Sequence, residues 1–417
     1  MKLLGATFVL TCDDNMEILR DGGVLIDNGK IQAIGDFNTL KEKYRHCDSL
    51  FYKQHVLVPA LINAHIHFEF SKNTSSFVYG DFGMWLDSIM ENRDEVFQDN
   101  VKAIQRAILE QKKNGVGTVC AISSHDLDIE LLLRSNLRVI FCHEVLGVNH
   151  KDFENQVLQI STRLERSLSV KNDLFQPALA LHAPYSVHSK LAQYLIDLAA
   201  KYNLLVSTHF LESKHEREWL DSQSGYFSEF YSKYLQLQEV ESFSQESFLA
   251  LFADISHVLF THCLYADSEL KQKILNYGAI VSCPRSNLLL NTKLGDNMII
   301  GTDGKSSNND VSLLNEIRYA FFSALANQDK ASQYANIESL AKDMLYAVTR
   351  NPALALGLNN GILQEGKSAD IAIFKLDCED SRQITTHFVL HAKEAVSLFV
   401  NGIDIISQNI NTCAEAE

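Results

Sequence analysis

Short apolar runs that alternate with amphipathic segments are the strongest constraint on the fold of this chain. We count eight such runs, at residues 56–62, 117–122, 137–146, 178–182, 204–209, 257–262, 279–283 and 299–303. The segments between them have apolar residues at helical spacing, at residues 101–113, 153–168, 189–202, 267–277 and 311–324. Alternating strands and helices favour a parallel sheet. Eight units of this kind predict an α/β fold with a (β/α)8, TIM-like barrel.

The two ends of the chain have a different pattern. Residues 1–55 and about 357–405 contain short alternating runs with turn sequences such as Asp27-Asn28-Gly29 and Asn401-Gly402. This pattern predicts a small β-sandwich subdomain formed by both termini. The expected division is therefore 1–55 and 357–417 for the two parts of the β subdomain, with the barrel over 56–356. A chain of 417 residues can hold both, since such a barrel takes about 250 residues.

A pair of histidines, His65 and His67, directly follows the first apolar run. Side chains two apart on a strand point the same way, so two imidazoles converge on one point. Two later runs end on His209 and Asp303. Three nitrogens and one carboxylate oxygen suit zinc or a similar divalent ion and leave a position for water, whose pKa the metal lowers to about 7.

Each histidine taken singly is more simply explained as a core or surface residue. The joint pattern favours a metal site, because every proposed ligand lies at the end of a predicted strand. In barrel enzymes the catalytic residues come from these carboxyl ends. The sequence therefore predicts a hydrolytic metal site held by His65, His67, His209 and Asp303.

Three further polar residues fall on or just after strand ends. Glu212 is placed to exchange a proton between the attacking water and a substrate nitrogen. His262 is placed to orient the water or stabilise the oxygen of a tetrahedral intermediate, and His182 to contact substrate. Two alternatives stay open: Glu212 as a carboxylate at a helix start, favoured by the helix dipole, and His182 as a satisfied core histidine.

Other metal chemistries fit the sequence less well. The cytidine deaminase pattern of H-x-E with P-C-x-x-C is absent, and so is the protease pattern H-E-x-x-H. A two-metal barrel hydrolase needs a bridging lysine near the fourth strand, and neither residues 137–146 nor 178–182 contain one. A single metal is therefore favoured.

Composition limits the partners and the compartment. The formal net charge is −15 and no basic run occurs, which argues against a nucleic-acid partner. The eight cysteines show no C-x-x-C spacing, and several lie in apolar runs, as expected of buried thiols in the cytoplasm. The apolar start of the chain is short and predicts a strand, and no segment is long enough to span a membrane. Homo-oligomer formation is possible, with no interface readable in the sequence.

Five motifs together resemble the amidohydrolase superfamily, specifically its mononuclear deaminase and chlorohydrolase branch. They are residues 59–67, 181–186, 208–213, 283–287 and 301–308, and the resemblance spans nearly the whole chain. It implies that His65, His67, His209 and Asp303 hold one divalent metal, Zn²⁺ or Fe²⁺. It also implies that Asp303 takes the first proton from the water and that Glu212 protonates the ring nitrogen of the substrate.

Within this branch, residues 63–71, 79–82 and the pair Trp85-Leu86 are similar to the 6-aminodeoxyfutalosine deaminases of menaquinone biosynthesis. This likeness implies deamination of an adenine nucleoside, with 6-aminodeoxyfutalosine converted to futalosine and ammonia. The substrate is then a small purine nucleoside. Phe68 and Trp85, with His182, are the candidate substrate contacts, since an aromatic wall suits a carboxyphenyl group. Core packing is the alternative for both aromatic residues.

Three questions stay open at this point. Branch relatives hold the ribose hydroxyls with a carboxylate past the Trp-Leu pair, and here Glu91 and Asp94 both qualify. Deamination of methylthioadenosine, S-adenosylhomocysteine or adenosine is the nearest alternative activity, although the bulkier residues 68–70 depart from those enzymes. A catalytically silent barrel that acts as a binding or assembly protein is a remote alternative, because such a protein is expected to lose ligands that this chain retains.

Overall fold

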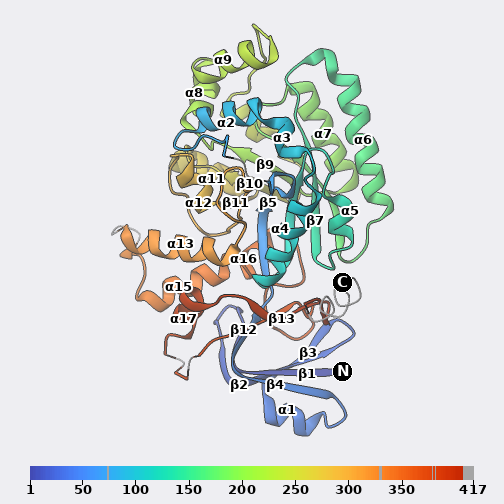
Figure 1. The fold of residues 1–417 in the computed structure, drawn as a ribbon, viewed down its shortest axis with the longest axis vertical. Coiled ribbons are helices and arrows are strands. Elements are labelled where there is room, and N and C mark those ends of the chain that lie inside the picture. Colours follow the sequence, from blue (N-terminus) through green and yellow to red (C-terminus); the bar gives the residue numbers. More distant parts are fainter. Residues whose placement is uncertain (73–74, 328–330, 378, 381, 407–417) are drawn as a thin grey trace.

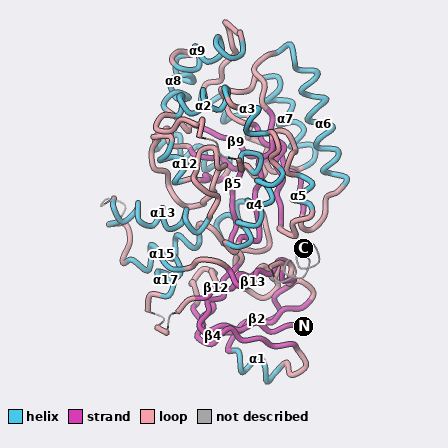
Figure 2. The backbone as a smooth tube through the Cα atoms, viewed as in Figure 1, coloured by secondary structure: helices cyan, strands magenta, loops and turns pink. Residues whose placement is uncertain are grey.

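The computed structural model describes residues 1–406 except 73, 74, 328–330, 378 and 381. Two sheets organise this part of the chain, a barrel surrounded by helices and a second sheet that carries the N-terminus (Figure 1). Colouring by secondary structure separates the helix-rich barrel from the strand-rich terminal region (Figure 2). Residues 407–417, which fall in the predicted C-terminal part of the β subdomain, lie outside the described residues.

Seven consecutive strands form the barrel sheet, and each pairs with its neighbours in parallel. They are β5 (Leu61–Ile66), β6 (Val116–Ser123), β7 (Arg138–Val145), β8 (Phe175–Leu181), β9 (Val206–Phe210), β10 (Val258–His262) and β11 (Ala279–Val281). The predicted TIM-like barrel is confirmed. The strands lie close to the apolar runs because buried parallel strands are apolar on both faces.

The eighth apolar run, residues 299–303, is not a regular strand. Ile300 forms a parallel bridge with Ser282, and the amide of Thr302 donates to the carbonyl of His65 at 3.0 Å. The segment thus fills the gap between β11 and β5 without extended pairing. The backbone leaves the extended conformation at the end of the segment, since Asp303 has a φ of +62°. The barrel is nearly closed.

The helices of the barrel follow the predicted segments closely. Two match to the residue, α4 (Val101–Lys113) and α7 (Ser189–Tyr202). The side chain of His188 caps the start of α7, and Asn203 ends it in the left-handed conformation.

The remaining helices of the described residues are α1 (Phe37–Lys43), α2 (Phe82–Glu91), α3 (Arg93–Phe97), α5 (Ile129–Leu133), α6 (Phe153–Ser169), α8 (Lys214–Ser222), α9 (Tyr226–Phe230), α10 (Gln245–Ala250), α11 (Ser268–Tyr277), α12 (Pro284–Leu289), α13 (Leu313–Ala326), α15 (Ile337–Tyr346), α16 (Arg350–Ala355) and α17 (Ile384–His391). Three short helical turns accompany them, η1 (Phe68–Phe70), η2 (His150–Asp152) and η3 (Tyr231–Leu235).

Both ends of the chain build the second sheet, as predicted. Its strands are β1 (Lys2–Leu10), β2 (Ile18–Asp27), β3 (Lys30–Asp36), β4 (Asp48–Pro59), β12 (Ile371–Lys375), β13 (Ala395–Val400) and β14 (Ile403–Asp404). Hydrogen bonds join all seven in one mixed sheet of order β14-β13-β12-β4-β1-β2-β3, rather than in two separately bonded layers. The N-terminal apolar run is the buried strand β1, and β4 leads into β5 through the single residue Ala60.

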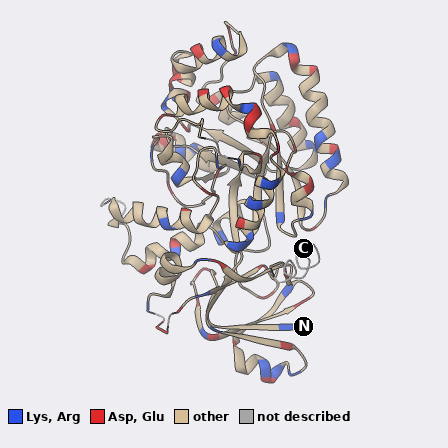
Figure 3. Ribbon diagram, viewed as in Figure 1, with Lys and Arg blue, Asp and Glu red and all other residues tan. Residues whose placement is uncertain are grey.

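An apolar core fills the interior of the barrel. Alternate residues of neighbouring strands point inward, among them Ala64, Cys120, Ile122 and Cys142, which belong to one buried cluster. The carboxyl ends of all these parallel strands therefore open on the same side. Lysine and arginine positions alternate with acidic ones along the ribbon in this view (Figure 3). Within the described residues, no helix has the length and apolar character needed to cross a membrane.

Candidate active site

Three imidazoles meet at the carboxyl end of the barrel. The Nε2 atoms of His65 and His67 lie 3.1 Å apart, and that of His209 lies 3.2 Å from the first and 3.3 Å from the second. All three residues are buried. His65 belongs to β5, His67 follows that strand, and His209 belongs to β9, so period-two spacing and parallel strands bring them together.

Asp303 joins this group from the segment that closes the barrel. Its Oδ1 lies 3.9 Å from Nε2 of His65 and 3.7 Å from Nε2 of His67. Its other oxygen, Oδ2, accepts a hydrogen bond from the hydroxyl of Ser286 at 2.9 Å. The backbone amide of Gly304 donates to Oδ1 at 2.7 Å. The carboxylate is therefore held with one oxygen toward the imidazoles.

The Nδ1 atoms of two imidazoles, those of His209 and His65, contact polar groups on the side away from the cluster. Nδ1 of His209 donates to the carbonyl of His182 at 3.0 Å, which leaves Nε2 of this ring as the unprotonated nitrogen in a neutral imidazole. Nδ1 of His65 lies 3.2 Å from the hydroxyl of Thr261. Supporting contacts of this kind orient metal-bound histidines in proteins.

Burial and mutual proximity keep two of the imidazoles, those of His65 and His209, neutral. Burial, with the neighbouring imidazoles, holds the pKa of His65 well below its usual value. The same causes lower the pKa of His209 to about 3. Neutral nitrogens that face one another cannot all be satisfied by hydrogen bonds among themselves, whereas a cation accepts electron pairs from every one. With the carboxylate of Asp303, the donor set fits a first-row divalent ion.

A second group of polar side chains lies beside the first. Oε1 of Glu212 lies 3.4 Å from Nε2 of His262, and carboxylate oxygens of Glu212 and Asp303 lie within 4.8 Å of each other. Nδ1 of His262 lies 2.8 Å from the side-chain oxygen of Asn287, which sets the ring orientation. Burial, followed by the charges of Asp303 and Glu216, raises the pKa of Glu212 well above its usual value. A carboxyl of this kind holds a proton that it can donate.

The turn that carries Glu212 is fixed by another buried carboxylate. Glu216 accepts hydrogen bonds from the amides of Leu211 at 2.7 Å and Glu212 at 2.9 Å. Ser213 caps α8 through the amide of Glu216. The alternative role of Glu212 as a solvated helix-start carboxylate does not match its burial, since only 5 % of the residue is exposed.

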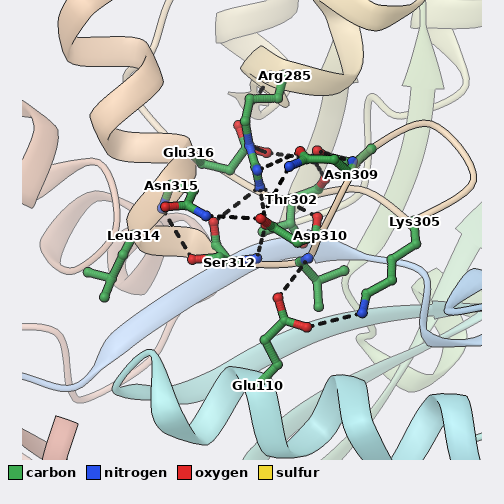
Figure 4. A network of polar contacts seen from close by, with 12 residues as sticks. Glu110, Arg285, Thr302, Lys305, Asn309, Asp310, Ser312, Leu314, Asn315 and Glu316 are labelled. Carbon is green, nitrogen blue, oxygen red and sulfur yellow. Dashed lines mark hydrogen bonds and ion pairs between the residues drawn. The ribbon is translucent and has the colours of Figure 1, made fainter. Parts of the chain in front are cut away.

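A closed polar network holds the loop after Asp303 (Figure 4). Arg285 donates from Nε to Glu316 at 2.9 Å and from Nη2 to Asp310 at 2.7 Å. Asn308 donates to Glu316 at 2.6 Å and to the carbonyl of Thr302 at 2.8 Å. Each charged group in this network has an opposite charge or a hydrogen-bond donor beside it. The network therefore fixes the backbone on both sides of Asp303.

The predicted substrate contacts lie in different surroundings. His182 is half-buried at the end of β8, with Nδ1 2.7 Å from the hydroxyl of Ser186. Trp85 is half-buried on α2, and its indole N–H donates to the carbonyl of Ser306 at 2.8 Å. Phe68 has no exposed surface and lies in the largest apolar cluster, which favours the core alternative for this residue.

Neither carboxylate proposed to hold ribose is buried. Glu91, at the end of α2, accepts from the hydroxyl of Tyr234 at 3.0 Å and pairs with Lys233 at 3.3 Å. Asp94 lies exposed in the first turn of α3. Neither carboxylate forms an ion pair with His65, His67 or His209.

Several supporting residues were not singled out by sequence reasoning. Ser286 and Asn287, which contact Asp303 and His262, both lie in the motif at residues 283–287. The family resemblance of that motif predicts no role for either residue. Only the fold reveals these roles, because α12 carries Ser286 and Asn287, whereas their partners lie 17 and 25 positions away on other segments.

Comparison with known proteins places this geometry in a family. The sequence model that describes the amidohydrolase family matches residues 56–403 of this chain. The chain is 37% identical to a protein from Helicobacter pylori named adenosine deaminase, over 97% of this chain and 100% of that protein. It is 33% identical to an aminodeoxyfutalosine deaminase from a Nitratiruptor species, over 92% of this chain and 95% of the relative.

A solved structure has the same fold over almost the full length. It is an aminofutalosine deaminase from Helicobacter pylori in complex with methylthio-coformycin. The two chains share 36% identity with a TM-score of 0.91, covering 97% of this chain and 100% of the other.

Proposed function

Because the chain belongs to the amidohydrolase family, we propose that it catalyses the hydrolytic deamination of an adenine nucleoside. The observation that carries the proposal is the convergence of three imidazoles and two carboxyl groups at the open end of the barrel. Water must attack and ammonia must leave in such a reaction. Both steps need groups that accept and donate protons beside the reacting carbon.

His65, His67, His209 and Asp303 would hold one divalent cation, Zn²⁺ or Fe²⁺. When bound, such a cation lowers the pKa of a water to about 7, so that hydroxide is present at neutral pH. The remaining catalytic steps belong to side chains of this chain. Both metals accept nitrogen and oxygen ligands, so the donor set leaves the choice between them to experiment.

Proton transfer is assigned to the two carboxyl groups. We assign to Asp303 the acceptance of the proton from the attacking water, since its Oδ1 faces the imidazoles. Glu212, whose raised pKa keeps it protonated, donates to the ring nitrogen next to the reacting carbon. His262, held by Asn287, is placed to stabilise the oxygen that develops negative charge.

The proposed substrate is 6-aminodeoxyfutalosine, converted to futalosine and ammonia in menaquinone biosynthesis. The sequence likeness at residues 63–71 supports it, and so do the names of the relatives from Nitratiruptor and Helicobacter pylori. We place the reaction in the cytoplasm. The six cysteines among the described residues, all free thiols, are consistent with a reducing compartment.

Adenosine or methylthioadenosine deamination is the second candidate. A relative named adenosine deaminase and a relative structure that contains methylthio-coformycin favour it. All these substrates share the adenine ring and differ in the group at the 5′ position. The imidazole and carboxyl cluster therefore cannot distinguish them, and the distinction depends on residues farther from the ring.

Steady-state kinetics with metal-loaded protein test the proposal. Absorbance should change as the adenine ring becomes hypoxanthine, with one ammonia released per nucleoside. We expect kcat/KM for 6-aminodeoxyfutalosine to exceed that for adenosine and methylthioadenosine. Equal values would remove the narrower assignment, and no ammonia from any nucleoside would contradict deamination altogether and favour a silent binding barrel.

A further inference from the structure

A row of aromatic rings leads outward from one imidazole of the active site. The ring of Phe70 lies 5.9 Å from that of His67, measured between centroids, and contacts it edge to face. Phe97, the last residue of α3, lies 5.2 Å from Phe70, and His125 lies 4.9 Å from Phe97. Exposure increases along the row, from buried His67 through half-buried Phe70 and Phe97 to exposed His125.

An arginine lies at the outer end of this row. Nη2 of Arg93 lies 3.1 Å from Nε2 of His125, and its guanidinium lies 5.9 Å from the centroid of Phe97. Arg93 forms no ion pair with any carboxylate of the described residues, including Asp94 and Glu95 beside it in the sequence. Its remaining N–H groups are thus available to a ligand.

The backbone that carries His125 is held in place. The buried carboxylate of Glu69 accepts hydrogen bonds from the amides of Ser124 at 2.7 Å, His125 at 3.1 Å and Leu127 at 2.9 Å. Glu69 lies two residues after His67, so the loop after β6 is tied directly to the metal-ligand segment. The far end of α3 is fixed as well, because Lys72 donates to the carbonyls of Glu95 and Gln98.

We propose that Phe70, Phe97, His125 and Arg93 form the subsite for an anionic aromatic group at the 5′ end of the nucleoside. This proposal rests on the proposed function, since the adenine ring must lie beside the imidazole cluster for the 5′ group to reach the subsite. A carboxyphenyl group matches this subsite, because its ring precedes its carboxylate just as the aromatic side chains precede Arg93 along the row. The phenyl ring packs on Phe70 and Phe97, and the carboxylate accepts from the guanidinium of Arg93.

This assignment gives a physical basis for discrimination among adenine nucleosides. Adenosine and methylthioadenosine have no carboxylate to accept from Arg93 and no ring to pack against Phe97. A planar guanidinium recognises a carboxylate through two parallel hydrogen bonds, which a neutral group cannot replace. Arg93 is therefore a specificity-determining residue that has no part in the proton transfers.

The test compares two ligands that differ by one methyl group, which removes the negative charge of the carboxylate. Futalosine and its methyl ester are titrated calorimetrically into the metal-loaded protein, so that binding is read without turnover. Wild type should bind the acid more tightly than the ester. The Arg93→Leu variant should weaken binding of the acid about 10- to 100-fold and leave the ester within about twofold. Arg93→Lys should retain part of the preference, since it keeps the charge but loses the paired geometry.

The matched control is Arg106→Leu, which removes an exposed arginine of α4 and should leave both affinities unchanged. The subsite is overturned if wild type does not distinguish acid from ester, or if Arg93→Leu keeps the preference. Absence of ammonia release from 6-aminodeoxyfutalosine would instead contradict the proposed function. Because the binding comparison needs no turnover, the two failures can be told apart.

Discussion

Two buried polar regions lie next to each other at the open end of the barrel, and they are built in opposite ways. In the first, three imidazole Nε2 atoms lie 3.1 to 3.3 Å apart, and no lysine or arginine of the described residues pairs with Asp303 beside them. In the second, Arg285 is paired with Glu316 and Asp310, and Asn308 supplies further donors (Figure 4). The imidazole cluster is therefore open, because its facing nitrogens cannot all satisfy one another, and the Arg285 network is closed, because its polar groups pair with one another.

The difference indicates that the closed network contributes to stability and that the open cluster contributes to function. Buried polar groups that satisfy one another hold a structure in place, whereas unmatched buried groups cost stability. A protein retains an unmatched group when a ligand completes it. The closed network therefore accounts for the position of Asp303, and the open cluster accounts for the chemistry. Replacements in the two regions should have correspondingly different effects.

The largest effect is expected from Glu212, to which we assign proton donation and no metal contact. Glu212→Gln should lower kcat about 10²- to 10⁴-fold, because a carboxamide cannot donate a proton as an acid does. Metal content, measured by atomic absorption, should stay at the wild-type value. Activity within tenfold of wild type would remove the assigned role, and loss of metal would assign Glu212 to the cation instead.

The closed network should respond in stability. Arg285→Met leaves Glu316 buried without its partner and should lower the free energy of unfolding by about 3 to 5 kcal/mol. Urea denaturation of metal-free protein measures this effect. The control is Arg166→Met, which breaks an exposed pair with Glu130 and should cost no more than about 1 kcal/mol. Equal losses in both variants would contradict the comparison.

Ser286 connects the two regions, because its hydroxyl contacts both Asp303 and Ser307. Ser286→Ala removes one hydrogen bond to the carboxylate, worth about 1 kcal/mol, and should lower kcat about fivefold with little change in KM. The structural contribution is checked by thermal unfolding of the same variant. A fall in stability without a fall in kcat would show that Ser286 supports the loop alone.

The smallest change in stability is expected within the open cluster. His67→Asn should alter the unfolding free energy of metal-free protein by less than about 1 kcal/mol, because the ring loses an edge-to-face contact with Phe70 while one of the mutually facing imidazole nitrogens is removed. The wild-type protein should gain stability on addition of Zn²⁺, and the variant should gain little. A large destabilisation of the metal-free variant would mean that the imidazoles stabilise one another.

Much of this arrangement follows from sequence periodicity. His65 and His67 were predicted to converge because strand residues two apart share a face, and the parallel direction of the strands brings His209 to the same end. The bounds of α4 and α7 follow from helical spacing. These features depend on local patterns that repeat along the chain.

Features that depend on tertiary contacts could not be predicted in this way. The turn η1 ends the alternation after His67, so the sequence could not show that Phe68 enters the core while Phe70 contacts His67. The eighth run forms a single bridge to Ser282 in place of a strand, and its backbone turns at Asp303. The pairing of Arg285 with Glu316 joins residues 31 apart on different helices.

X-ray absorption at the zinc edge tests the open cluster most directly. For the zinc-loaded wild-type protein, we predict one zinc per chain with three imidazole nitrogens and oxygen in its first shell. His67→Asn should lose one of these imidazoles or the metal. A first shell containing sulfur, fewer than three imidazoles in the wild type, or no bound zinc would contradict the account of a cation site at the barrel mouth.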